Sequence, residues 1–139
     1  FIVSSAHPDA CLHGNGFVAR LSGSTAEFLS LWRLMTVGQQ PFQFQEGALS
    51  LRFDPALAGW LFGEDGSFTF QFLGACDVTL INLQGLETYH EGFEIEKIRL
   101  HGLKEVVELN EPVIPSPYAG LVRAGKIKKI ECFYPSNGA

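Results

Sequence analysis

The chain has 139 residues, of which 46% are apolar, and it carries a formal net charge of −5. This length and apolar content provide for one domain with a hydrophobic core and exclude an intrinsically disordered chain. The negative charge argues against a nucleic-acid-binding surface, because the one basic cluster, Lys126, Lys128 and Lys129, is short.

Two further features of the composition bear on the compartment. No run of 18 apolar residues occurs, so no membrane-spanning helix is expected. The three cysteines, Cys11, Cys76 and Cys132, have no regular spacing, which predicts reduced thiols in a cytoplasmic protein. The chain opens with Phe1 rather than methionine, and we expect it to be a piece of a longer protein.

The first predicted element in chain order is an amphipathic helix over residues 24–37, after an irregular segment with several glycines. Ser24 and Glu27 have the spacing of a capping box. Gly38 and Pro41 follow as helix stop signals. Apolar residues fall at i, i+3, i+4 and i+7 and form one stripe: Phe28, Leu31, Trp32 and Met35.

After Pro41 the apolar pattern changes to alternation, which predicts strands. The predicted strands lie at residues 48–53, 67–72, 77–83, 93–100, 104–109 and 126–134, with a short helix over 117–124. Their spacing is typical of a β-sandwich or jelly roll. We therefore expect two domains, residues 1–40 with the helix and residues 41–139 as a mainly β domain.

The start of the predicted helix has two interpretations. Gly23 and Ser24 precede free backbone N–H groups at the positive end of the helix dipole, where a phosphate binds readily. Ser22 adds a hydroxyl group and Arg20 a positive charge. The alternative is that Ser24 is an ordinary helix cap.

Three aromatic residues near predicted loops, Trp60, Tyr89 and Tyr118, are candidates for stacking on a sugar ring. The alternative for each is packing in the hydrophobic core. His7, Cys11 and His13 match no familiar zinc spacing and lack a fourth ligand, so no metal site is predicted. No motif in this chain assigns a catalytic residue.

Three segments resemble the C-terminal region of the cellobiose and chitobiose phosphorylases, a family of inverting glycoside phosphorylases. The segments are "RLSGSTAEFLSLW", "GALSLRFDPALAGWLF" and "FTFQFLGACDVTLINLQG". The family has a phrase like "W-L-T-G-T-A-G-W-M" before a helix, then one like "L-R-I-D-P-C-I-P-x-x-W". Strands that end near "N-P" follow. The counterparts here are residues 21–29, 51–60 and 79–82, in the same order.

The resemblance implies a fold and an activity for the parent protein. Members join an (α/α)6 catalytic barrel to a C-terminal jelly-roll-like domain, and they cleave a β-linked disaccharide with inorganic phosphate to a sugar 1-phosphate. Phosphate takes the place of the water that an inverting hydrolase activates. The family's phosphate-binding Thr-Gly pair corresponds to Ser22 and Gly23, and the catalytic acid lies upstream of this chain.

Two functions are therefore expected from the sequence. In the first, the chain is the tail of a phosphorylase-like glycosyltransferase or hydrolase and is inactive alone. Its partners are the upstream barrel, a disaccharide and phosphate as co-substrate, with no other cofactor. In the second, it is a non-catalytic module for carbohydrate binding, bracing or dimerisation. In the fragment alone the barrel is missing, and a bare apolar helix face then favours a homodimer.

Overall fold

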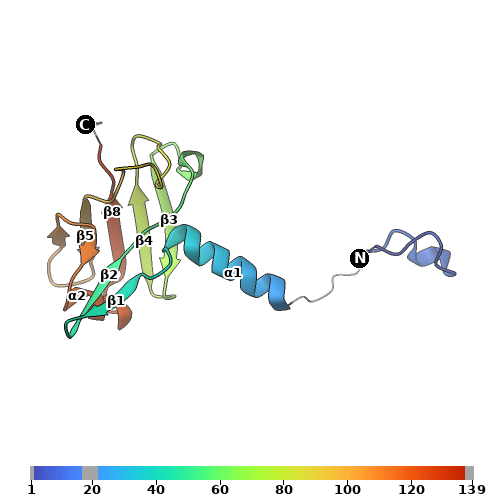
Figure 1. Ribbon diagram of the computed structural model, residues 1–139, viewed down its shortest axis with the longest axis horizontal. Coiled ribbons are helices and arrows are strands. Elements are labelled where there is room, and N and C mark those ends of the chain that lie inside the picture. The colour runs from blue at the N-terminus through green and yellow to red at the C-terminus, as the bar shows by residue number, and fades with distance from the viewer. Residues whose placement is uncertain (1, 17–21, 137–139) are drawn as a thin grey trace. The chain divides into compact units, whose positions relative to one another are not determined.

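The computed structural model describes residues 2–16 and 22–136 (Figure 1). In the second range the side chains are described from residue 25 onward. The chain divides into two compact units, Phe1–Leu31 and Trp32–Ala139. The division falls inside the first helix, and the domain boundary after residue 40 stays a prediction. Each unit is described by itself.

The first unit begins with a closed loop. Ile2 forms a bridge with Gly16, and the amide of Val3 donates to the carbonyl oxygen of Asn15 at 3.1 Å. The loop contains one 3-10 turn, η1 (Ala10–Leu12), whose start is capped by the carboxylate of Asp9. The described part of this segment is otherwise irregular, as the sequence indicated.

Helix α1 (Ser22–Thr36) begins two residues before the predicted start. Ser24 therefore lies within its first turn, and the prediction that Ser24 caps the helix is wrong. The helix ends as expected, because Gly38 has a φ of +93° that other residues rarely adopt. The predicted apolar stripe divides in two: Met35 packs against the core and Trp32 lies 6.4 Å from the ring of Phe68, but Phe28 and Leu31 are exposed.

The second unit is mainly β, with two sheets. The smaller sheet has the order β1-β2-β7 and is antiparallel; its strands are β1 (Phe42–Gln45), β2 (Ala48–Arg52) and β7 (Val113–Ile114). The larger sheet has the order β3-β4-β8-β5-β6, in which β4 and β8 are parallel and the other pairs antiparallel. Its strands are β3 (Ser67–Phe72), β4 (Cys76–Ile81), β5 (Lys97–His101), β6 (Val107–Leu109) and β8 (Lys129–Phe133).

The hydrophobic core contains side chains from both sheets. Alternate residues of the larger sheet point inward and are fully buried, among them Val78, Leu80, Ile98, Leu100 and Ile130. Phenylalanine rings from the two sheets contact each other. The ring centroid of Phe72 in β3 lies 5.3 Å from that of Phe53, which follows β2, and 5.9 Å from that of Phe42 in β1. These contacts are compatible with a β-sandwich-like domain.

The predicted strands are present, although several are shorter than expected. The segment 93–100 becomes a strand only from Lys97, and 104–109 only from Val107. Helix α2 (Tyr118–Arg123) lies where a short helix was predicted and buries Ala119 and Val122. Strands β1 and β7 were not predicted. No helix within residues 2–16 and 22–136 is long and apolar enough to cross a membrane.

Candidate functional site

The predicted anion site lies at the first turn of α1. Ser22, Gly23 and Ser24 all belong to this turn, where backbone N–H groups have no partner within the helix. Their side chains, and Arg20 as a whole, lie outside the described part of the structure. The backbone geometry is that of a helix N-terminus, and phosphate binding there stays a prediction.

The three aromatic candidates lie in different environments. Trp60 is in η2 (Gly59–Leu61) and is 82% exposed, and Tyr89 is 65% exposed in the loop between β4 and β5. Tyr118 begins α2 and packs partly against the core. Exposure therefore favours Trp60 and Tyr89 as stacking residues and disfavours Tyr118.

The loops that carry Trp60 and Tyr89 are held together by Thr88. Its buried hydroxyl accepts a hydrogen bond from the amide of Leu57 at 2.8 Å and donates one to the carbonyl oxygen of Pro55 at 2.6 Å. The amide of Thr88 in turn donates to the carbonyl oxygen of Leu57 at 2.9 Å. The structure thus places the two exposed aromatic residues on adjacent, mutually fixed segments, although they are far apart in sequence.

An open hollow of about 270 Å³ lies beside η2, lined by Gly59, Asp65, Asn82, Leu83 and Gln84 among others. The hydroxyl of Ser67 donates to the Asp65 carboxylate at 2.9 Å and its amide donates at 3.0 Å. These two bonds lower the pKa of Asp65, the hydroxyl contributing more, so this group is a fixed anionic acceptor at neutral pH. Trp60 follows Gly59, which lines this hollow, and an exposed indole and a fixed carboxylate acceptor are both groups that can bind a sugar.

A second hollow, of about 280 Å³, lies where α1 ends against the smaller sheet. Its lining is mostly polar and consists of Val37, Gln39, Gln40, Gln43, Arg52 and Asp54. The guanidinium group of Arg52 also contacts the Glu94 carboxylate at 3.0 Å. Amide, guanidinium and carboxylate groups together suit a ligand with several hydroxyl or anionic groups.

The chain approaches itself closely at this second hollow. A Cβ atom at Gly38 would lie 2.8 Å from the carbonyl oxygen of Asp54, so this crossing requires glycine. The amide of Asp54 donates a hydrogen bond to the carbonyl oxygen of Val37 at 3.1 Å. The guanidinium group of Arg33 donates one to the carbonyl oxygen of Gln39 at 3.0 Å. Sequence reasoning missed this hollow; its only signal was the glutamine-rich stretch "GQQPFQFQ".

The residues that the structure shows lining the two hollows include no cysteine and no histidine. Within the described residues no group of three or more His, Cys, Asp or Glu side chains is placed to hold a metal ion. Near the N-terminus, His7 accepts a hydrogen bond from the amide of Asp9 through Nδ1. Cys76 and Cys132 are buried and Cys11 is exposed.

Comparison with known proteins identifies no relative. No protein-family model, no curated protein and no solved structure matches the chain.

Proposed function

We propose that this chain is the C-terminal region of a carbohydrate-active enzyme similar to the cellobiose and chitobiose phosphorylases. In this proposal the two sheets form a jelly-roll-like β-sandwich, and α1 is the last helix of an (α/α)6 barrel in the preceding sequence. The intact cytoplasmic enzyme cleaves a β-linked disaccharide with inorganic phosphate, and the present chain alone is inactive.

One observation carries this proposal. Helix α1 precedes the β unit in the chain; Met35 near its C-terminal end packs against the core, while Phe28 is 68% and Leu31 58% exposed. Apolar side chains in a row on a helix are normally covered by another element. A barrel helix of the same polypeptide would provide that cover. The resemblance of the segments around residues 21–29 and 51–60 supplies the family.

The test uses the intact polypeptide that contains this chain. It is incubated with cellobiose or chitobiose, with and without inorganic phosphate, and sugar 1-phosphate is measured. We expect turnover that requires phosphate, and no turnover by residues 1–139 alone. Phosphate-independent release of free sugars would reject phosphorolysis.

A pair of serine variants tests the phosphate contact. Ser22→Ala removes a hydroxyl donor from the first turn of α1, and Ser30→Ala removes an exposed hydroxyl further along the same helix. A hydrogen bond to a charged group contributes roughly 1.5–3 kcal/mol, so Ser22→Ala should raise the KM for phosphate about tenfold or more. Equal effects of the two substitutions would place phosphate elsewhere.

The exposed aromatic pair supports a second candidate function, carbohydrate binding by the β unit itself. Trp60 and Tyr89 are exposed on loops tied by Thr88, and Gly59, the residue before Trp60, lines the hollow that contains Asp65. Oligosaccharide titration should quench Trp60 fluorescence in a Trp32→Phe background, which removes the other tryptophan. Tyr89→Ala should weaken binding, whereas Tyr118→Phe should leave it unchanged. Failure of β-linked oligosaccharides to bind at millimolar concentration would reject this function.

A further inference from the structure

Strand β1 has an open edge with its own pattern of hydrogen-bonding groups. In the described part of the chain it pairs only with β2, because it is an edge strand of the sheet β1-β2-β7. The hairpin turns at Glu46 and Gly47, both with positive φ, so Gln45 and Ala48 form a hydrogen-bonded pair. Hydrogen-bonded and non-hydrogen-bonded pairs alternate from there. The backbone N–H and C=O groups of Phe42 and Phe44 therefore point away from β2.

This edge lacks the features that usually prevent pairing with another strand. Residues 42–45, "FQFQ", carry no charge, and their register with β2 runs without a bulge. Pro41 precedes the strand, but the amide that it lacks would face β2, since its carbonyl oxygen accepts from the amide of Arg52 at 2.8 Å. Proline at this position does not block the outer edge.

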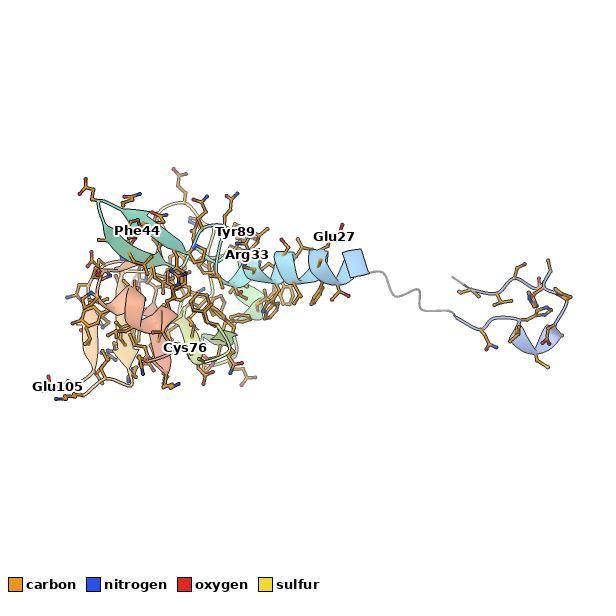
Figure 2. All side chains as sticks on the ribbon, turned by 90° about the horizontal axis from the view of Figure 1, so that it is seen from below. Glu27, Arg33, Phe44, Cys76, Tyr89 and Glu105 are labelled. Carbon is orange, nitrogen blue, oxygen red and sulfur yellow. The ribbon has the colours of Figure 1, made fainter. Side chains whose placement is uncertain are left out.

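The side chains of β1 show what the edge would bury. Phe42 and Phe44 lie on the same face of the strand. Phe42 stacks on Phe72 with ring centroids 5.9 Å apart, whereas Phe44 is 72% exposed (Figure 2). Phe44 thus continues the apolar face of Phe42 beyond the part of β1 that the core covers. Its exposed ring lies next to the backbone groups of β1 that have no partner in β2.

We propose that β1 pairs antiparallel with β1 of a second copy of this chain, about a two-fold axis at Gln43. In this register Phe42 lies opposite Phe44 of the partner subunit, and Phe44 lies opposite the partner's Phe42. Both pairs use the outward backbone groups, so each exchanges N–H···O=C bonds in both directions. The exposed ring of Phe44 then packs over a ring that is already fixed against the core.

The flanking residues fit the same register. Gln43 meets its symmetry mate on the opposite face, where two amide groups donate to and accept from each other. Glu46 falls opposite Gln40 of the partner subunit, so a carboxylate lies near an amide donor rather than near a like charge. Two copies with net charge −5 thus meet through a neutral, self-complementary segment. This self-complementarity favours a second copy over an unrelated extended peptide.

Disulfide trapping tests the register directly. Across the proposed axis the Gln43 pair is non-hydrogen-bonded, with Cα atoms about 4.5 Å apart, which is within disulfide range. In a Cys11→Ser background that removes the exposed native thiol, Gln43→Cys should form a disulfide-linked dimer. Gln45→Cys is the matched control, since it falls opposite Pro41 of the partner subunit and should cross-link at least tenfold more slowly.

Sedimentation of the whole chain over a concentration series tests the equilibrium. We expect a monomer–dimer equilibrium that Phe44→Lys weakens at least tenfold, with unchanged circular dichroism because this side chain is exposed in the monomer. Phe28→Lys on α1 should leave the equilibrium unchanged. The proposal is overturned if the unmodified chain stays monomeric at millimolar concentration, if both cysteine variants cross-link equally fast, or if only Phe28→Lys disrupts the dimer.

Discussion

Gly59 is the point at which the loop carrying Trp60 contacts the loop carrying Tyr89. A Cβ atom at residue 59 would lie 1.9 Å from the carbonyl oxygen of Gly85 and 2.8 Å from its carbonyl carbon. Both atoms belong to the backbone, so no side-chain rotation relieves the contact. The φ of Gly59 lies outside the left-handed region, and the substitution Gly59→Ala therefore tests this close approach alone.

The size of the effect follows from how far the loops must separate. A carbon–oxygen contact below 3.0 Å essentially never occurs for a Cβ atom, so the loops must separate by about an ångström. That displacement would stretch the bonds of Thr88 to Leu57, now 2.8 and 2.9 Å, beyond hydrogen-bonding range. Overpacking of this kind costs about 1–3 kcal/mol and each weakened bond about 1 kcal/mol. We expect Gly59→Ala to lower the free energy of unfolding by roughly 2–4 kcal/mol.

The assay is urea unfolding followed by circular dichroism, with Gly120→Ala as the control. Gly120 lies inside α2 and has no atom within 4 Å of its would-be Cβ, so alanine there should stabilise the protein by about 0.5–1 kcal/mol. In a thermal melt, Gly59→Ala should lower Tm by about 10 °C. If the free energy of unfolding of Gly59→Ala lies within about 0.5 kcal/mol of that of the unmodified chain, the loop contact is refuted.

Two more predictions concern buried polar groups and thiols. Thr88→Val removes the hydrogen bonds of the buried hydroxyl to Leu57 and Pro55 and should lower the free energy of unfolding by about 1–3 kcal/mol in urea. Thr69→Val, on an exposed strand face, should change it by less than about 0.5 kcal/mol. Burial raises the pKa of Cys76 to about 11 and raises that of Cys132 as well, so at pH 8 a thiol reagent should label only Cys11 rapidly. Rapid labelling of all three thiols without denaturant would contradict the buried positions.

The sequence predicted β3 and β4, whose apolar residues alternate along the whole strand. In β3 and β4 the residues Phe70, Phe72, Val78 and Leu80 are all buried, as period-two alternation requires. The two-residue strand β7 has no periodicity to detect, and its Val113 and Ile114 are a strand because they pair with Arg52 and Leu51 of β2. Such a strand depends on a tertiary contact and leaves no local signal.

The start of α1 shows a different limit of sequence reasoning. Ser24 and Glu27 matched the capping-box spacing, but the helix begins at Ser22 and includes Gly23. Serine is favourable at either position, and the cost of one glycine in a first turn is about 1 kcal/mol or less. Local preferences of this size do not decide between two starts so close together.

The polar hollow and the open edge both depend on the register of one hairpin, which residue types alone do not specify. The turn at Glu46 and Gly47 sets Gln43 opposite Ser50, and Arg52 follows on the same face. A shift of the pairing by one residue would turn Gln43 toward the core and Phe44 toward the opposite face. Gln43 lines the hollow only in the observed register, and only there do the Phe42 and Phe44 amides face outward. The glutamines of this segment are thus informative only once the turn is known.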